Sequence, residues 1–369
     1  MRIIHLFDHL NQGNMGILKT TSALSVALKE AYDIPSELWF PRGKAEIAPQ
    51  ARGLDLVPLE HTDLGFLNAI LSRQAIIPHT TTVMTHGCWQ HPTLWGQALK
   101  KRGCYWIYTP HGMLEPWSRQ QKWLKKWLYF RVIEQIQAAN ADIIRAVSRP
   151  EHLNLQKKFP QTTVTLIPYG LKSDPTLDRA WAETLDQPRI CTILFMARLH
   201  PKKGIMPLIE GWCRSILYQN PGYELAIAGF DDGALPYLTQ TLNALSNANI
   251  RYLGPVFGQE KAQVLAQSRY YILPSHSEGL PTSVLEAMQC GLIPLISDGC
   301  NLPEAIDAGI ALRCNPNPEA IAQVLNSLPS LSPHEQQHRR LAAQNFVETH
   351  FAVEKTAARL MRLIPCLQS

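Results

Sequence analysis

Strand-like apolar runs that alternate with helix-like segments are the feature of this sequence that most constrains its fold. Strands that alternate with helices predict parallel sheets with helices on both faces, which is the α/β class. In such sheets, ligands bind beyond the carboxyl ends of the strands. The runs occur in both halves of the chain, at residues 1–9, 36–40, 54–59, 64–72, 82–85, 105–109, 143–147, 164–168, 191–196, 224–228, 250–253, 270–274, 293–297 and 310–312.

The length of the chain predicts two domains. Its 369 residues, of which 46% are hydrophobic and 18% charged, describe a globular protein that is too long for one ordinary core. We expect a first domain at residues 1–172 and a second at residues 190–345. Between them, residues 173–189 are polar, include two prolines and lack a clear period, which predicts a linker.

Charge and cysteine content limit the partners and the cellular compartment that we expect for the protein. The net charge of +5 permits an acidic partner without requiring one. The eight cysteines include no Cys-x-x-Cys pair, which argues against a zinc site and favours reduced thiols. No apolar run reaches the length of a membrane span, and the first residues are too polar for a signal peptide. We therefore expect a cytoplasmic protein.

The most informative stretch covers residues 270–291. It combines a strand that ends at Pro274, a polar loop that contains Glu278, and a short helix that contains Glu286 about one turn from its start. Free N–H groups at residues 280–284 could face anionic groups of a ligand held at both ends by the two carboxylates. A sugar nucleotide has such a layout. Alternatively, Glu286 is a solvated helix residue and Glu278 only favours the helix dipole.

The motif Pro-Ser-x-x-Glu-Gly-x-Pro-x-x-x-Leu-Glu-Ala-Met-x-x-Gly in this stretch resembles the donor-site signature of family 4 retaining glycosyltransferases. The resemblance implies the GT-B fold, in which two Rossmann-like domains with parallel sheets face each other across a cleft. A C-terminal helix within residues 346–369 would pack back toward the first domain. The implied reaction moves a hexose, with retention, from a UDP or GDP sugar to a glycan or lipid-linked acceptor. The chain has no Asp-x-Asp triplet and this fold generally needs no divalent metal, so we expect no metal and no cofactor besides the sugar nucleotide.

The resemblance also implies roles for individual residues of the second half. Glu278 would accept hydrogen bonds from sugar hydroxyls, and Glu286 from the ribose. Val256 falls where the family packs the base. Two further stretches, Pro-His-Gly-Met-Leu and Cys-Asn-Leu-Pro-Glu, are similar to those of enzymes that build exopolysaccharide or lipopolysaccharide. The helix start that would bind the donor consists of Gly279, Leu280, Pro281 and Thr282.

Two cations stand at another strand end. Arg198 and Lys203 follow the strand-like run 191–196 and precede a helix, where a phosphate could be held at the helix N-terminus. A solvated basic turn is the alternative. Their spacing resembles the family motif Arg-Leu-x-x-x-Lys-Gly, which implies that both cations bind the diphosphate and take part in catalysis.

A turn that contains Gly13 and Gly16 follows the first strand and opens a helix, as in nucleotide-binding βαβ units. A turn that merely needs positive φ explains the two glycines equally well. In the family, a glycine-containing loop at this place faces the donor phosphates and the acceptor, so the resemblance implies that Gly13 and Gly16 bind the donor.

Two histidines, His86 and His111, stand at strand ends of the first half. A lone histidine is more often a hydrogen-bonded structural residue than a catalyst. The motif Tyr-Thr-Pro-His-Gly-Met-Leu-Glu-Pro-Trp around His111 resembles one whose histidine contacts the transferred sugar, so we expect His111 to support the sugar without acting as a general base. His86 would line the cleft or be structural. Tyr169, in Ile-Pro-Tyr-Gly, stands where the family commonly has Asn.

Residues 119–131 predict a basic, aromatic helix. A helical wheel places the tryptophans, leucines and Phe130 on one side and the lysines and arginine on the other. Such a helix could dock on an anionic membrane at the inner face of the plasma membrane, or it could be an ordinary helix that buries its tryptophans. No nucleic-acid-binding module accompanies the charges, so we expect no nucleic acid partner. The alternative functions are a sugar-nucleotide epimerase or hydrolase of the same fold and a non-catalytic sugar-nucleotide-binding subunit.

Overall fold

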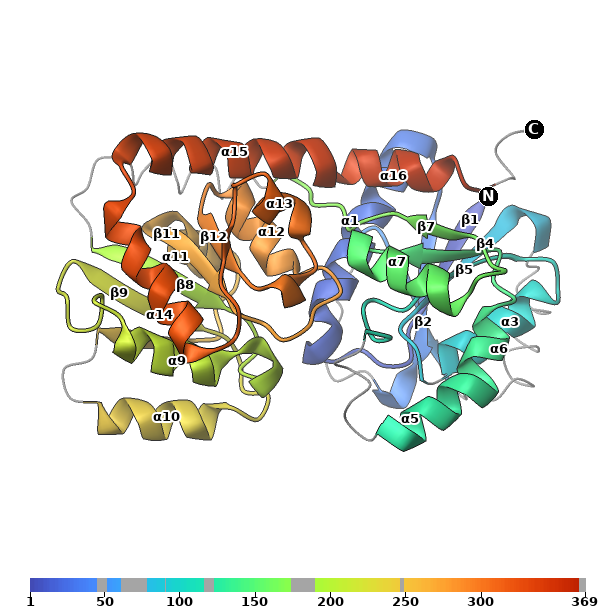
Figure 1. Ribbon diagram of the computed structural model, residues 1–369. Coiled ribbons are helices and arrows are strands. Elements are labelled where there is room, and N and C mark those ends of the chain that lie inside the picture. The colour runs from blue at the N-terminus through green and yellow to red at the C-terminus, as the bar shows by residue number, and fades with distance from the viewer. Residues whose placement is uncertain are drawn as a thin grey trace. The chain divides into compact units, whose positions relative to one another are not determined.

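Figure 1 shows the computed structural model of the protein, which describes residues 1–44, 52–60, 78–89, 91–115, 123–173, 190–245 and 249–364. The chain divides into two compact units. Unit 1 consists of Met1–Lys172 together with Phe351–Ser369, and unit 2 consists of Ser173–His350. Unit 1 is therefore assembled from two separate parts of the sequence.

Unit 1 is built on a seven-stranded parallel sheet with the strand order β3-β2-β1-β4-β5-β6-β7. The strands are β1 (Arg2–Leu6), β2 (Ser36–Pro41), β3 (Asp55–Leu59), β4 (Thr81–His86), β5 (Tyr105–Thr109), β6 (Ile143–Ala146) and β7 (Val164–Leu166). The helices are α1 (Met15–Tyr32), α3 (His91–Lys100), α5 (Trp123–Tyr129), α6 (Gln135–Ala138), α7 (Arg149–Lys158) and α16 (Val353–Met361), with the 3-10 turn η1 (Gln12–Asn14) before α1 and the π-helical turn η4 (Phe130–Glu134) between α5 and α6.

Successive side chains of the central strand β1 enter two separate hydrophobic cores. Ile3 belongs to a core that also contains side chains of α1 and Leu360 of α16. The next residue, Ile4, belongs to a core that contains Trp95 of α3 and Phe130 of η4. Because successive residues of a strand point to opposite faces, helices cover both faces of this sheet (Figure 1).

Unit 2 is built on a six-stranded parallel sheet with the strand order β10-β9-β8-β11-β12-β13. The strands are β8 (Cys191–Met196), β9 (Tyr223–Ala228), β10 (Ile250–Gly254), β11 (Ser268–Leu273), β12 (Ile293–Ile296) and β13 (Leu312–Arg313). The helices are the 3-10 turn η5 (Pro201–Lys203) and α9 (Ile205–Arg214), α10 (Leu235–Ala244), α11 (Gly258–Gln267), α12 (Thr282–Gln289), α13 (Pro303–Asp307), α14 (Pro318–Ser327) and α15 (Pro333–Phe351).

The two sheets confirm the predicted α/β class with two Rossmann-like units. In each sheet the strand order reverses beside the first strand, between β1 and β4 in unit 1 and between β8 and β11 in unit 2. Ligands of doubly wound sheets bind outside the carboxyl ends of the strands at this switch point. The predicted run 64–72 and residues 174–189 of the predicted linker lie outside the described residues. That the two sheets face each other across a cleft stays a prediction.

The C-terminal helix α16 completes the core of unit 1. Its side chains Val353 and Leu360 are buried in the core that contains Ile3. The helix start is fixed by two main-chain hydrogen bonds: the N–H of Leu171 donates to the oxygen of Phe351 at 2.7 Å, and the N–H of Val353 donates to the oxygen of Leu171 at 3.0 Å. The end of the first chain segment and the start of the last one therefore form one structure.

Candidate active site

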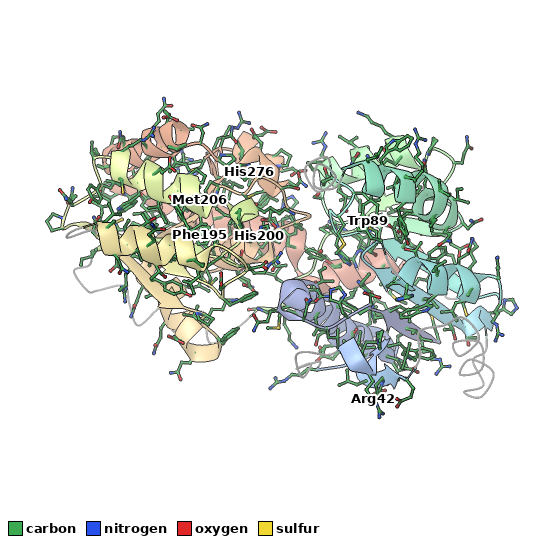
Figure 2. The ribbon with its side chains drawn as sticks, turned by 90° about the horizontal axis from the view of Figure 1, so that it is seen from below. Arg42, Trp89, Phe195, His200, Met206 and His276 are labelled. Carbon is green, nitrogen blue, oxygen red and sulfur yellow. The ribbon has the colours of Figure 1, made fainter. Side chains whose placement is uncertain are left out.

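The switch point of unit 2 brings together three of the charged residues that the sequence singles out. Arg198 and Lys203 follow β8, and Glu278 follows the neighbouring strand β11. Figure 2 labels His200 and His276, which belong to the same two loops. The loops after the two strands therefore place cations and a carboxylate at the edge of the sheet where a ligand of this fold would bind.

The turn after β8 depends on Gly204. Its φ of +74° lies in the left-handed region, and a Cβ atom there would lie 2.0 Å from the main-chain oxygen of Pro274. His200 accepts a hydrogen bond from the N–H of Lys202 at 2.9 Å and so caps η5. The main-chain oxygen of Lys202 in turn accepts from the N–H of His276 at 2.8 Å. The two loops are therefore fixed to each other through their main chains.

Lys203 and Glu278 form a buried ion pair. The Nζ and Oε1 atoms lie 2.6 Å apart, and the side chains are only 12% and 11% exposed. The Ser275 hydroxyl donates to the same Oε1 at 2.7 Å. Burial alone would raise the pKa of Glu278, but the charges of Lys203 and Lys202, with the hydrogen bonds from Lys203 and Ser275, lower it below its usual value. The alternative of a solvated basic turn is therefore wrong for Lys203.

Arg198 is held by a carboxylate of the following loop. Its Nη1 lies 2.6 Å from Oδ2 of Asp232, and the two side chains are 34% and 37% exposed. The neighbouring Asp231 accepts hydrogen bonds from three main-chain N–H groups of residues 233–235 at the start of α10. The pair of aspartates thus holds one cation and one helix start. Within the described residues, no group of three or more His, Cys, Asp or Glu side chains could hold a metal ion.

The predicted donor-binding residues 279–282 lead into α12, whose first residue is Thr282. The side-chain amide of Asn301 fixes this loop by donating to the main-chain oxygen of Glu278 at 2.6 Å. Glu286 is buried one turn into α12, and its Oε2 lies 2.5 Å from Nζ of Lys261 on α11. The alternative in which Glu286 is a solvated helix residue is therefore wrong.

The loop after β10 carries Val256 and Phe257. Val256, the residue expected to pack against the base, is buried, whereas the next residue, Phe257, is 60% exposed at the start of α11. Sequence reasoning missed Phe257 and Lys261. An aromatic residue directly after a strand, and a lysine on the next helix, are the signals that could have identified them.

The first loop of unit 1 contains Gly13 in η1 and Gly16 in the first turn of α1. Both glycines are exposed and neither has positive φ, so the alternative of a turn that needs positive φ is wrong. The loop is held instead by Asn11 and Asn14, each of which accepts a hydrogen bond from the main-chain N–H of the other. Two residues without side chains therefore stand at the N-terminus of an 18-residue helix, where a ligand could approach the N–H groups.

His111 follows β5 and lies in a chain of buried side chains. Its Nε2 lies 2.9 Å from Nδ1 of His86, and its Nδ1 lies 2.7 Å from the hydroxyl of Tyr169. Nε2 of His86 lies 2.9 Å from Nδ1 of His5 on β1. Burial, followed by the charge of Arg145, lowers the pKa of His111 well below its usual value, so the imidazole is neutral. The sequence motifs single out His86 and His111 but not His5, which lies on the strand next to β4.

The helix predicted over residues 119–131 is described from Trp123 onward, so Arg119 and Lys122, as well as the side chains of Lys125 and Lys126, lie outside the described residues. The helix continues through η4 and α6 to Ala138. Phe130 is buried, whereas apolar side chains on the rest of the helix are exposed: Leu124, Trp127, Leu128, Val132 and Ile136. The wheel places Leu124 and Leu128 on the same side as the buried Phe130, but both leucines are exposed, so its apolar side is not one buried face. An ordinary helix with a buried Trp127 is wrong as well.

Residues 185–345 match the family model described as glycosyl transferases group 1. The matched segment of unit 2 is thus similar to group 1 glycosyl transferases. The match includes the strands β8 and β11 and the loops that carry Arg198, Lys203 and Glu278. The charged edge of the sheet therefore lies within the segment that matches the family model.

Curated relatives of the chain are glycosyltransferases. It is 30% identical to the O-antigen chain mannosyltransferase B of Escherichia coli over 139 residues. The aligned segment covers 37% of this chain and 36% of the relative. It is 30% identical over 193 residues to the amylovoran biosynthesis glycosyltransferase AmsK of Erwinia amylovora, covering 49% and 46%. A third relative, a phosphatidylinositol N-acetylglucosaminyltransferase subunit of Arabidopsis thaliana, is 23% identical over 76% of this chain and 62% of the relative. The chain thus spans 36% to 62% of the length of these relatives.

Solved structures extend the likeness to both units. The sucrose-phosphate synthase of Thermosynechococcus elongatus superposes with a TM-score of 0.75 at 17% identity and covers 98% of both chains. The Anabaena protein HepE, solved in complex with UDP and glucose, superposes with a TM-score of 0.73 at 15% identity and also covers 98% of both chains. At this identity the likeness shows the fold alone, and it confirms the GT-B fold expected from the sequence.

Proposed function

We propose that the protein is a retaining glycosyltransferase that moves a hexose from a nucleotide-diphosphate sugar to a glycan or lipid-linked acceptor. The observation that carries this proposal is the buried Lys203–Glu278 pair at the switch point of unit 2, within the segment that matches the family model. The names of the relatives, which refer to O-antigen, amylovoran and phosphatidylinositol, support a glycan or lipid-linked acceptor. The UDP and glucose bound to HepE support a UDP sugar as the first donor to test, with GDP sugars second.

The proposed chemistry uses positive charge to stabilise a leaving phosphate. The bond between the anomeric carbon and the phosphate oxygen breaks, which leaves negative charge on the diphosphate and positive character on the sugar. Arg198, Lys203 and the N–H groups at the start of α12 would stabilise this negative charge. The acceptor oxygen then bonds to the anomeric carbon, and the departing phosphate oxygen takes the acceptor's proton. No metal and no dedicated protein base enters this scheme.

The ion pairs of the site hold the cations in place until the donor binds. Lys203 contacts Glu278 and Arg198 contacts Asp232, so each cation already lies beside an anionic oxygen. A diphosphate would offer the same cations stronger anionic partners, because it carries more charge than a carboxylate. Glu278 would then accept hydrogen bonds from the sugar hydroxyls while Ser275 continues to orient it.

The remaining donor contacts follow from the loops around this pair. The exposed ring of Phe257 and the buried Val256 would pack against the base. Glu286 would accept from the ribose hydroxyls, with Lys261 holding the carboxylate in position. In unit 1, Gly13 and Gly16 would give the donor phosphates access to the start of α1, and His111 would support the transferred sugar.

The alternative functions receive less support. A sugar-nucleotide epimerase or hydrolase needs a catalytic acid or base, for which His111 and Glu115 are the candidates near the predicted sugar. Both ring nitrogens of His111 are hydrogen-bonded, and Glu115 is buried and accepts a hydrogen bond from Asn154 at 3.2 Å. A non-catalytic binding subunit would not need the full set of cations and carboxylates at the switch point.

A thermal-shift screen with UDP and GDP sugars tests the donor site directly. A ligand that binds only the folded protein raises Tm, and the rise grows with the logarithm of 1 + [L]/Kd, so we expect one nucleotide sugar to stabilise the wild type. Arg198→Ala should remove that stabilisation. Arg251→Ala is the matched control, because Arg251 also pairs with a carboxylate, Glu224, but lies on β10 away from the switch point. Equal shifts in all three proteins would exclude Arg198 from the site, and no shift in the wild type would remove the proposed function.

We also propose that the helix from α5 through α6 docks the protein on an anionic membrane at the inner face of the plasma membrane. Leu124, Leu128, Val132 and Ile136 recur every four residues along this helix, and all are more than half exposed. Beside them, a cavity of about 150 Å³ is lined by three basic side chains, two aromatic side chains and one amide, namely Arg131, Lys157, Lys158, Trp127, Phe130 and Gln135. Apolar side chains next to cations match the acyl chains and phosphate groups of an anionic lipid surface. Within the described residues no helix is long and apolar enough to cross a membrane.

Sedimentation with lipid vesicles tests this surface. We expect the wild type to pellet with phosphatidylglycerol vesicles and to stay in solution with phosphatidylcholine vesicles. The double variant Leu128→Ser/Val132→Ser and the double variant Lys157→Glu/Lys158→Glu should each lose pelleting. Ile216→Ser/Leu341→Ser is the matched control, because these two side chains are similarly exposed but lie in unit 2. The absence of wild-type pelleting, or pelleting that survives both changes, would contradict membrane docking.

A further inference from the structure

We propose that His5, His86 and Tyr169 are positioning residues for His111, which they hold as the Nε2–H tautomer through a hydrogen-bond chain with one fixed direction. The hydrogen-bond chain joins one helix, two strands and two loops of unit 1: Ser25 of α1, His5 of β1, His86 of β4, His111 after β5 and Tyr169 after β7. The inference rests on the proposed function in one respect only, namely that His111 supports the transferred sugar.

The direction of the chain follows from a single hydroxyl group. The Ser25 hydroxyl has one hydrogen, and it donates that hydrogen to the main-chain oxygen of Thr21 at 2.9 Å. Towards His5 it can therefore only accept, so Nε2 of His5, 3.4 Å away, carries the proton and Nδ1 of His5 is an acceptor. A neutral imidazole has one donor and one acceptor nitrogen, and this fixes each later link in turn.

Applied along the chain, this rule leaves no choice of tautomer. Nε2–H of His86 donates to Nδ1 of His5, and Nε2–H of His111 donates to Nδ1 of His86. The last acceptor, Nδ1 of His111, receives the hydroxyl hydrogen of Tyr169. Every ring nitrogen from His5 to His111 is thus satisfied, while an imidazolium at His5 or His86 would place two N–H donors against each other.

The hydrogen-bond chain holds the His111 side chain in place and does not form a path for proton transfer. All its members are buried, and its inner end is the fully buried Ser25, whose hydrogen goes to a main-chain oxygen. A proton that entered at His111 would therefore find no exit. Arg145 adds a second reason, because its buried guanidinium donates to the main-chain oxygens of Ile167 and Pro168 beside Tyr169 and its charge opposes protonation of the histidines.

The residue that the hydrogen-bond chain holds, His111, has an uncommon backbone conformation. His111 has a φ of +55°, in the left-handed region that non-glycine residues rarely adopt, and Gly112 follows with a φ of +75°. The N–H of Gly112 donates to Glu151 Oε1 at 2.5 Å. Side-chain and main-chain hydrogen bonds together therefore fix the turn after β5, at the edge of the sheet where ligands bind.

Tyr169 distinguishes the support of His111 in this protein from the pattern of the resembled family. It occupies the position at which the resembled family commonly has Asn, a side chain too short to replace a tyrosine hydroxyl at that distance. Gly170 allows the close packing that this placement needs, because a Cβ there would lie 2.5 Å from Cα of Val353 on α16. The Tyr169 turn is thus held between α16 and His111.

Two-bond proton–nitrogen correlation spectra of the histidine rings test the tautomers in the wild type, without any variant or substrate. We expect His5, His86 and His111 each to show a protonated Nε2 and an unprotonated Nδ1 at neutral pH. A protonated Nδ1 in any of the three would overturn the proposed chain. His152, whose Nε2 lies 3.2 Å from the main-chain oxygen of Val164, serves as an internal reference outside the hydrogen-bond chain.

Tyr169→Phe tests the positioning role. It removes one hydroxyl, so we expect His111 to populate both tautomers and sugar transfer to lose kcat by about 10-fold to 100-fold with little change in donor KM. Tyr105→Phe is the matched control, because its hydroxyl also makes one hydrogen bond in unit 1, to Leu363, and lies outside the chain. An unchanged His111 tautomer, or an unchanged kcat, in Tyr169→Phe would overturn the role. If the wild type transfers no sugar, the proposed function fails. The spectra alone then test whether the three histidines have the proposed tautomers.

Discussion

The switch points of the two units differ in how they hold their polar side chains. In unit 2 the side chains are ionised and paired, as in Lys203–Glu278 and Arg198–Asp232. In unit 1 they are neutral and linked in series, from Ser25 to Tyr169. Charged pairs can exchange one partner for an anionic ligand, whereas a neutral chain with a fixed direction can only hold its members still. The same sheet topology thus holds ionised pairs at one switch point and a neutral hydrogen-bond chain at the other.

The largest effect that distinguishes the two sites should come from Lys203→Met. Removal of one partner from a buried ion pair leaves Glu278 without compensation, which costs about 3–5 kcal/mol of stability. Loss of one cation at the leaving group should also lower turnover by about 100-fold or more. Chemical denaturation and a sugar-transfer assay measure the two effects.

A double variant separates stability from catalysis in this pair. Lys203→Met/Glu278→Leu replaces both charges by apolar groups, so we expect it to recover most of the stability while sugar transfer stays absent. Recovery of transfer in the double variant, or full activity in Lys203→Met, would show that the pair is only structural.

Acid should act on the two units at different pH values. Burial, with the charge of Arg145, lowers the pKa of His5 to about 3, so the folded unit excludes a proton that the unfolded chain binds below about 6.5. The stability of unit 1 should therefore be complete above pH 6.5 and fall as pH decreases, by about 1.4 kcal/mol per pH unit for each histidine. His86 acts in the same sense, as does His111. Glu151, whose pKa burial raises to about 7, acts in the opposite sense but is outnumbered.

Unit 2 should stay stable to lower pH than unit 1, because the pKa of its buried Glu278 is lowered. The pKa of Glu278 is lowered from the usual 4.5, so its stabilising effect is present above pH 4.5 and is lost only as pH falls through the lower folded value. Hydrogen exchange of peptides from β1 and β4, compared with peptides from β8 and β11, measures both units in one sample. Equal acid sensitivity of the two sets would contradict the proposed difference.

Arg198→Ala should affect catalysis strongly and stability weakly. Its pair with Asp232 is about one-third exposed, and such pairs contribute about 1 kcal/mol or less. Loss of a cation at the leaving phosphate should still reduce turnover by about 100-fold. Arg251→Ala, the exposed pair on β10, should change neither quantity, and similar activities for both variants would exclude Arg198 from catalysis.

The smallest effect should come from Asp232→Asn, which removes the carboxylate that competes with the donor for Arg198. We expect donor affinity to rise, by no more than about fivefold, because an exposed pair contributes at most about 1 kcal/mol. Titration calorimetry with the donor found in the thermal-shift screen measures this change. Weaker binding would show that Asp232 orients Arg198 rather than competing for it.

The sequence predicted what depends on local pattern and missed what depends on strand order. The strand–loop–helix around Glu278 follows from residues that are close in sequence, and so do the alternating strands of both sheets. The link between His5 and His86 spans 81 positions and arises only because β1 and β4 are neighbours. No local signal in the sequence indicates which strands pair, so the role of Tyr169 was also out of reach.

Packing between elements set a second limit. The helical wheel of residues 119–131 groups Phe130 with Leu124 and Leu128, but only the folded unit shows that Phe130 is buried and the two leucines are exposed. The pairing of Glu286 with Lys261 was missed for a related reason, because it joins two different helices, α12 and α11, whose side chains meet only in the folded unit. Side-chain pairing between elements requires the tertiary fold.

The division of unit 1 between both ends of the chain bears on how the protein is made. The core under β1 includes Val353, Leu360 and Ile364, so it stays open to water while the ribosome is still translating unit 2. Unit 2, which is continuous in sequence, can close its own core earlier. The half of the protein that leaves the ribosome first is therefore the half that finishes folding last, and an interrupted message would yield a chain with an exposed apolar sheet face.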